Sequence, residues 1–178
     1  MAIIKVKDRK FERSINASVI DAAVQRVAGE INHDYNGKDP LFLAILNGSF
    51  IFAADLLRKI TIPCRISFVK LASYSGTTSK KQIDELIGLN EDIKGKHVII
   101  VEDIVDTGLT IDKLLTDLKH FNPASVRLAC FTFKKDAFVK DFHIDYLGIT
   151  IPDEFVVGYG LDYDGYGRNL PDIYKLID

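Results

Sequence analysis

Short apolar runs alternate with amphipathic segments along most of this chain. Runs rich in aliphatic residues, or alternating apolar and polar residues, predict strands over residues 41–46, 64–71, 97–101 and 125–133, with shorter ones over 86–89, 146–150 and 154–157. Helical spacing of apolar residues predicts helices over residues 16–33, over 50–60, and through Ile111, Leu114 and Leu118. The first of these helices would begin at Asn16 or Ser18 and turn Val19, Ile20, Ala23, Val24, Val27 and Ile31 to one face.

The order of these elements indicates the fold class. Strands that alternate with helices are typical of a parallel sheet with helices on both faces. The chain of 178 residues suits one domain with a full-sized core, and it shows no internal repeat or low-complexity segment. We therefore predict a single α/β domain over residues 1–178.

Composition and charge narrow the class of protein. Hydrophobic residues make up 47% of the chain and charged residues 27%, and the net charge of −2 gives no general attraction to nucleic acid or to an anionic membrane. There is no apolar run of membrane-spanning length, and residues 1–13 lack the apolar stretch of a signal peptide. Cys64 and Cys130 form no CxxC motif, so we expect reduced, buried cysteines in a cytoplasmic protein.

The residues after the apolar run 97–101 carry the strongest chemical signal. Glu102, Asp103 and Asp106 follow this run, and the segment 107–110, Thr-Gly-Leu-Thr, opens the next helix. In an open parallel sheet, ligands bind beyond the carboxyl ends of the strands, and a turn that opens a helix offers N–H groups to a phosphate. Carboxylates beside a phosphate suggest sugar hydroxyls and a divalent cation. An ordinary strand-turn-helix with a solvated acidic loop would explain the run and the helix, but not this combination, which indicates a ribose phosphate with magnesium.

This segment resembles the signature of the phosphoribosyltransferases, which use 5-phosphoribosyl 1-diphosphate (PRPP). Other segments narrow the resemblance to the hypoxanthine-guanine phosphoribosyltransferases: Leu46-Asn47-Gly48-Ser49, Ser73-Tyr74, Lys134, and the stretch 151–163 with its sequence Ile-Pro-Asp-Glu-Phe-Val-Val-Gly-Tyr-Gly-Leu-Asp-Tyr. The last is the most specific, since other phosphoribosyltransferases share the signature but not this stretch. The resemblance runs from about Phe11 to the end. It implies a type I phosphoribosyltransferase fold: a mainly parallel twisted sheet flanked by helices, with a small C-terminal hood over the purine site.

The resemblance also implies a reaction, in which Mg²⁺-dependent transfer of the phosphoribosyl group from PRPP to hypoxanthine or guanine gives IMP or GMP and diphosphate. Asp106 would take the N7 proton of the purine, although Asp is also among the best helix N-caps. Lys134 would donate to the purine O6 and so favour oxopurines over adenine. Ser73 and Tyr74, in a polar loop over residues 73–82, would form a lid that excludes water; the alternative is a plain hairpin tip.

The remaining roles are carried over from the family onto matching positions. Glu102 and Asp103 would face the ribose hydroxyls, directly or through magnesium-bound water. The 5-phosphate would lie on Thr107, Gly108, Leu109 and Thr110, mainly on their N–H groups. Diphosphate would bind Arg168 and the turn Leu46-Asn47-Gly48, with a cis peptide before Asn47. Relatives carry lysine at this position, and Asn47-Gly48 is also simply a good turn dipeptide.

The resemblance also implies which residues form the purine pocket. Phe155 would stack on the base, the backbone of Val156 and of Asp162 would read its edge, and the Asp162 side chain would hold a second Mg²⁺. Taken alone, a Phe-Val-Val run is usually core and a single arginine is usually solvated. We expect small-molecule partners, no nucleic acid or membrane partner, and a homodimer or homotetramer. Two alternatives stay open: a xanthine-preferring enzyme, and a PRPP-sensing regulator that binds nucleic acid, for which the lysines are too scattered.

Overall fold

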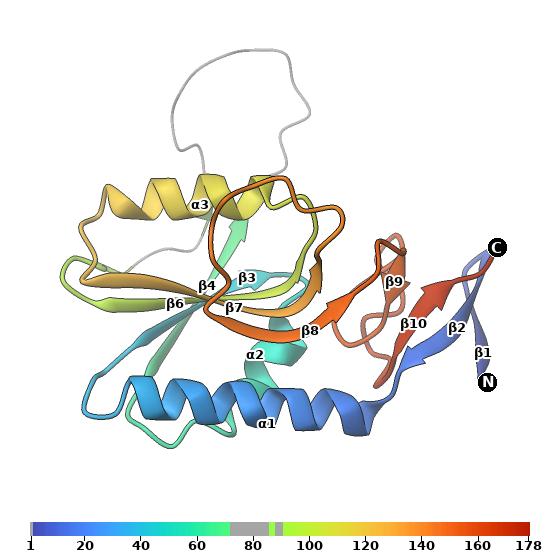
Figure 1. Cartoon of the computed structure of the whole chain (residues 1–178), viewed down its shortest axis with the longest axis horizontal. Helices are drawn as coiled ribbons and strands as arrows, with labels where there is room; N and C mark the ends of the chain where they lie inside the picture. The colour runs from blue at the N-terminus through green and yellow to red at the C-terminus, as the bar shows by residue number, and fades with distance from the viewer. Residues whose placement is uncertain (1, 72–85, 88–90) are drawn as a thin grey trace, which may run out of the picture.

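A twisted sheet of six strands forms the centre of the molecule (Figure 1). The computed structural model describes residues 2–71, 86–87 and 91–178. The strand order is β5-β4-β3-β6-β7-β8, with β5 antiparallel to β4 and every other pairing parallel. The strands are β3 (Leu41–Leu46), β4 (Arg65–Leu71), β5 (Leu86–Ile87), β6 (His97–Val105), β7 (Ser125–Lys134) and β8 (Tyr146–Ile151). The predicted α/β fold is confirmed.

Helices cover both faces of this sheet. Figure 1 shows α1 (Ala17–Asp34) and α2 (Phe50–Leu57) on one face and α3 (Leu109–Lys119) on the other. Alternate residues of β3 pack on opposite sides: Phe42 joins the core under α1 and α2, whereas Leu43 joins the core under α3. The Asn16 side chain caps α1 by accepting a hydrogen bond from the Val19 N–H at 3.0 Å.

Some predicted boundaries and burials were wrong. Helix α2 ends at Leu57, not at residue 60, because Lys59 and Ile60 bond three residues back in a tighter final turn. Val19 is exposed although Ile20 beside it is buried, because Val19 lies at the edge of the buried stripe of α1, at helical spacing from exposed Arg26 and Glu30. Cys130 is buried but Cys64, in the loop before β4, is only partly covered; both are free thiols. Within the described ranges, no helix combines the length and apolar character needed to cross a membrane.

A second, antiparallel sheet forms the hood, and it contains both ends of the chain (Figure 1). Its order is β1-β2-β10-β9, from β1 (Ile3–Val6), β2 (Arg9–Ile15), β10 (Ile173–Leu176) and β9 (Val156–Val157). The prediction placed the hood in the C-terminal part alone. Strand β2 carries four charged residues, Arg9, Lys10, Glu12 and Arg13, and Phe11 is its one fully buried side chain, so its sequence has little strand character.

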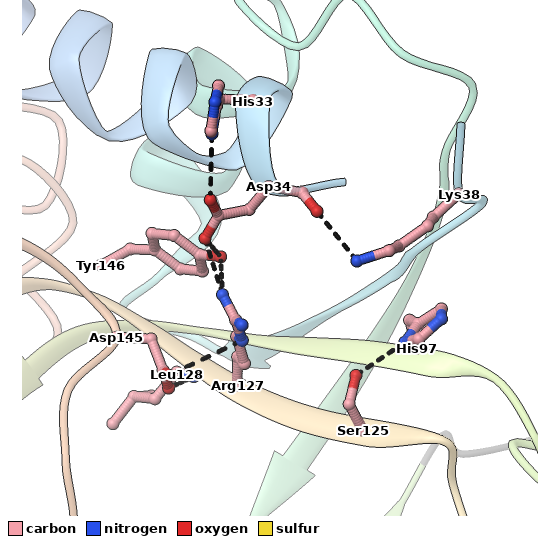
Figure 2. Close-up of polar contacts among 9 residues, drawn as sticks. All are labelled: His33, Asp34, Lys38, His97, Ser125, Arg127, Leu128, Asp145 and Tyr146. Carbon is pink, nitrogen blue, oxygen red and sulfur yellow. Dashed lines mark hydrogen bonds and ion pairs between the residues drawn. The ribbon is translucent and has the colours of Figure 1, made fainter. Parts of the chain in front are cut away.

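A polar network ties the end of α1 to the amino ends of β7 and β8 (Figure 2). The Arg127 guanidinium donates to Asp34 Oδ2 and to the Tyr146 hydroxyl, both at 2.7 Å, and the Tyr146 hydroxyl donates to the same Asp34 oxygen at 2.8 Å. Asp145 accepts from the Leu128 N–H at 2.9 Å and lies 3.8 Å from Arg127 Nε. Hydrogen bonds from Tyr146 and His33, and then the Arg127 charge, lower the pKa of Asp34.

Replacing Arg127 tests how much this network stabilises the fold. Arg127→Ala removes both hydrogen bonds to Asp34 and Tyr146, so urea unfolding should show a loss of about 1–2 kcal/mol near pH 7. Because the pKa of Asp34 is lowered on folding, its contribution is present above the unfolded pKa of about 4 and is lost as the pH falls through the folded value. The difference between wild type and variant should therefore shrink toward pH 3.

The matched control is Arg65→Ala, which removes a single exposed pair with Asp39 at 2.8 Å. Such a pair contributes less than about 1 kcal/mol. Equal losses for Arg65→Ala and Arg127→Ala would contradict a special role for the network.

Candidate active site

Strand β6 extends past its neighbour β3, and this places the acidic residues. β6 pairs with β3 only as far as Val101, opposite Ala44, but it pairs with β7 as far as Val105. The strand is longer than the predicted run 97–101: Glu102 and Asp103, which were expected to follow it, both lie within β6. The Thr132 hydroxyl of β7 donates to the Asp103 carbonyl at 2.7 Å and holds this extension in place.

The two carboxylates in this extension are shielded from water and receive few hydrogen bonds from the described part of the protein. Asp103 is buried, and Glu102 Oε2 is buried without a hydrogen-bond partner among the residues that the structure describes. Burial, and then the neighbouring Asp103, raise the pKa of Glu102 well above its usual value. Carboxylate oxygens in this situation suit a hard divalent cation.

The donor set fits Mg²⁺ better than a cation held by protein alone. Within the described part of the chain, no group of three or more His, Cys, Asp or Glu side chains converges on one point. Mg²⁺ is commonly held by one or two carboxylates together with substrate phosphates. Glu102 and Asp103 therefore suit a cation that arrives with a phosphorylated ligand.

The turn after β3 lies directly against Asp103. The peptide between Leu46 and Asn47 is cis, as the resemblance implied. A Cβ atom at Gly48 would overlap the Asp103 carboxylate, and a Cβ atom at Gly160 of the hood would overlap the Gly48 carbonyl oxygen. A side chain at Gly160 would collide with backbone, and one at Gly48 would displace the Asp103 carboxylate, so the close packing of these glycines brings the turn, the acidic strand and the hood together.

The turn after β6 has the form expected of a phosphate site. Gly108, at φ +82°, is the N-cap of α3, and the Leu109 N–H donates to the Thr107 hydroxyl at 3.5 Å, so Asp106 is not the N-cap. The segment after β7 supports this turn: the Val139 N–H donates to the Thr107 carbonyl at 3.2 Å, and a Cβ atom at Gly108 would lie 2.5 Å from the Phe138 ring. A surface pocket here is lined by Glu102, Ile104, Val105, Asp106, Thr107, Gly108, Thr110 and Ile111. Leu109 is exposed and does not line it.

Lys134, at the end of β7, bridges two carboxylates. Its Nζ lies 3.1 Å from Asp106 Oδ2 and 3.1 Å from Asp153 Oδ1. Burial acts to lower the pKa of Lys134, but the hydrogen bonds to Asp106 and Asp153 outweigh it and the pKa is raised overall. The structure thus brings the predicted pair Asp106 and Lys134 together. Asp153 had no predicted role, although it lies in the stretch that carried the resemblance.

The hood holds the remaining predicted residues. Phe155 packs against Phe11 and Tyr163 at centroid distances of 6.3 and 5.9 Å, yet it stays partly exposed. Val156 is buried in β9.

Asp162 and Arg168 contact each other in this segment. Arg168 Nη2 lies 2.7 Å from Asp162 Oδ1, and Arg168 Nη1 donates to the Gly160 carbonyl at 2.6 Å. Asp162 Oδ2 accepts from the Gly165 N–H at 2.7 Å. Since Gly160 packs on Gly48, both side chains lie in the segment that meets the turn after β3. Their roles toward diphosphate and metal stay predictions. Ser73 and Tyr74 lie outside the described residues.

Comparisons of this chain with a family model, with related sequences and with solved structures all point to the same family. Residues 16–164 match the family model for the phosphoribosyl transferase domain. The chain is 36% identical over 176 residues to a hypoxanthine-guanine phosphoribosyltransferase of Aquifex aeolicus, covering 98% of this chain and 99% of that protein. It is 41% identical to one of Streptococcus pneumoniae over 86% of each chain. A hypoxanthine phosphoribosyl transferase structure from Trypanosoma cruzi superposes with a TM-score of 0.87 at 33% identity, covering 98% of this chain and 95% of that one.

Replacing Glu102 tests the burial of an unpartnered carboxylate. Because its pKa is raised in the fold, ionisation of Glu102 destabilises the folded state at pH values above the unfolded pKa of about 4.3. Without divalent cation at pH 7, Glu102→Gln should raise the free energy of unfolding by about 1–3 kcal/mol in urea titrations. The gain should vanish below about pH 4, where the group is protonated in both states.

The control is Glu91→Gln, which removes a surface pair with Lys96 at 3.4 Å. It should change the free energy of unfolding by less than about 1 kcal/mol. A wild type more stable than Glu102→Gln at pH 7 would contradict the burial argument.

Proposed function

The chain belongs to the phosphoribosyltransferase family, among relatives named hypoxanthine-guanine phosphoribosyltransferase, and on that premise we propose that it is a purine-salvage enzyme. It transfers the 5-phosphoribosyl group of PRPP to N9 of hypoxanthine or guanine, and the products are IMP or GMP and diphosphate. The observation that carries this proposal is the Asp106–Lys134 pair, 3.1 Å apart, at the edge of the pocket formed by the turn before α3.

Asp106 is the general base in this scheme. The bond between C1 of the ribose and the diphosphate oxygen breaks, diphosphate leaves with the bonding electrons, and N9 of the purine forms the new bond to C1. The purine loses its N7 proton to the Asp106 carboxylate in the same process. Asp106 is half exposed and lines the pocket, so the carboxylate is accessible to a ligand there. A general base in this position typically contributes about 10²–10⁴ in rate.

Lys134 selects the base. Its ammonium has three N–H donors, two of which bond to Asp106 and Asp153 here. The remaining donor suits the O6 acceptor of an oxopurine, whereas adenine presents an amino group at this position. Phe155 stacks on the purine, and the backbone groups of Val156 and Asp162 meet its edge.

PRPP lies along the two turns. The N–H groups and hydroxyls of Thr107, Gly108, Leu109 and Thr110 hold the 5-phosphate at the start of α3, where the positive end of the helix dipole adds to the attraction. The Glu102 and Asp103 carboxylates accept hydrogen bonds from the ribose hydroxyls. Diphosphate contacts Arg168 and the backbone of the turn Leu46-Asn47-Gly48. Since Asn47 is neutral, this turn contributes its backbone without a positive side chain.

Mg²⁺ is the proposed cofactor. Glu102 and Asp103 would hold it beside the ribose, and Asp162 would hold a second ion with diphosphate. When bound, the metal offsets the negative charge of the carboxylates and of the leaving diphosphate. The small-molecule partners are PRPP, the two bases, the two nucleotides and diphosphate. We further propose a homodimer or homotetramer in the cytoplasm, where the two free cysteines would stay reduced.

Nucleotide synthesis from four bases tests the proposal. With PRPP and Mg²⁺, wild type should convert hypoxanthine and guanine but not adenine. Asp106→Asn should slow this conversion by about 10²–10⁴. The control Asp112→Asn, in α3 and paired with Lys140 at 2.8 Å, should leave the rate near that of wild type. Turnover of xanthine alone would contradict the specificity. PRPP binding without turnover of any base would favour a sensor.

Metal removal tests the role of the two carboxylates in β6. EDTA should abolish nucleotide formation, and added Mg²⁺ should restore it. Asp103→Asn should raise the Mg²⁺ concentration for half-maximal rate by about tenfold or more, since it removes one anionic ligand. Exposed Asp141 serves as the control, because Asp141→Asn should leave the Mg²⁺ requirement unchanged. Full activity in EDTA would contradict the metal assignment.

A further inference from the structure

Three charged side chains of alternating sign stand at the carboxyl ends of three adjacent strands. Asp106 follows β6, Lys134 ends β7, and Asp153 follows β8. The register fixes this order: Val105 pairs with Phe133, and Lys134 pairs with Ile151. Because adjacent strands lie about 4.8 Å apart, Lys134 reaches a carboxylate on either side.

The lysine is shared evenly between its neighbours. Both contacts measure 3.1 Å, and the Lys134 side chain is 10% exposed, against 48% for Asp106 and 59% for Asp153. Two carboxylates thus share one cation, and the group as a whole keeps one negative charge. Within the described ranges, every hydrogen bond and ion pair of the Asp153 side chain goes to Lys134.

The proposed chemistry makes conflicting demands on the contact between Asp106 and Lys134. Asp106 must accept the N7 proton, while the Lys134 ammonium must donate to O6 of the same purine. If Asp106 were its only partner, the Lys134 ammonium would have to break that ion pair to reach the purine. It would then be a partly buried charge without a carboxylate partner, which is costly. A second carboxylate on the far side of the lysine removes that difficulty, since the ammonium stays paired when it turns to the purine.

We propose that Asp153 is a positioning residue that holds the Lys134 ammonium for the purine O6 and so releases Asp106 to act as the base. The inference rests on the proposed function and adds a residue to it. Asp153 acts through Lys134 and does not touch the reacting atoms. With this role, recognition of the oxopurine depends on a residue that follows β8 as well as on residues at the ends of β6 and β7.

A double-mutant cycle separates this role from a merely structural one. Asp153→Asn should lower kcat/KM for hypoxanthine by about tenfold, the effect of losing one charge-assisted hydrogen bond. The change should lie in kcat and in KM for the purine, and KM for PRPP should stay within about twofold of wild type. In a Lys134→Gln background, the same substitution should add less than about twofold, because the partner is already gone.

Two further variants complete the test. Asp153→Glu keeps the charge and should recover part of the lost kcat/KM. Glu154→Gln removes the adjacent carboxylate, which pairs with Lys175 at 3.3 Å, and should leave kcat/KM unchanged. Because the Asp153 side chain is exposed and Asn has the same shape, the melting temperature of Asp153→Asn should stay within a few degrees of wild type.

The outcomes distinguish the inference from its premise. An inactive wild type refutes the proposed function, and the role of Asp153 falls with it. An active wild type with equal losses from Asp153→Asn in both backgrounds would show that Asp153 acts independently of Lys134 and overturn the inference alone. Wild-type kinetics for Asp153→Asn, or a loss confined to KM for PRPP, would also overturn it.

Discussion

Parallel pairing of β6 with β7 and of β7 with β8 is the constraint on which the site depends. The pairing continues to Val105 in β6 and to Lys134 in β7, beyond the point where β3 stops pairing with β6. It brings charged residues that are far apart in the sequence to neighbouring strand ends. A slip of one residue would turn Lys134 to the opposite face of the sheet and away from both carboxylates. The apolar interiors of β6 and β7 pack into the cores on both faces of the sheet and hold their register, while β8, at the edge, packs into the core under α1 and α2.

At this edge of the sheet, the carboxylates that suit ligand binding do not stabilise the fold. Glu102 has a buried oxygen without a described partner, and Asp103 is pressed against the backbone of Gly48. Neither arrangement stabilises the fold. A cation and a sugar phosphate would supply partners to these carboxylates, so binding energy and local stability are coupled here. By contrast, the Arg127 network lies at the amino ends of the strands, where its hydrogen bonds serve the fold (Figure 2).

The sequence predicted most of the central sheet because its signals are local. Strand β3 and the helices on either face follow from hydrophobic periodicity, and the turn at Gly108 follows from residue types. The hood was only partly predictable: β2 pairs with β10 across the whole length of the chain, and its charged sequence gives no local strand signal. The extension of β6 through Glu102 and Asp103 was missed for a related reason, since β7 supports it from outside the segment.

The candidate site was likewise predicted only in part, because some of its contacts depend on tertiary packing. Asp106 and Lys134 were named from the resemblance, and the structure brings them into contact. Asp153 was not named, because only the register between β7 and β8 shows that it shares the same lysine. The contact between Gly48 and Gly160 likewise depends on tertiary packing that no spacing in the sequence encodes.

In the proposed function, one edge of the sheet holds the sugar, the phosphate and the purine together. A crystal structure of the protein with IMP and Mg²⁺ tests it most directly. The account predicts the 5-phosphate on the N–H groups of residues 107–110, the ribose hydroxyls at Glu102 and Asp103, and O6 within hydrogen-bond distance of Lys134 Nζ. IMP bound elsewhere, or in the opposite orientation with its base at the start of α3, would contradict the account.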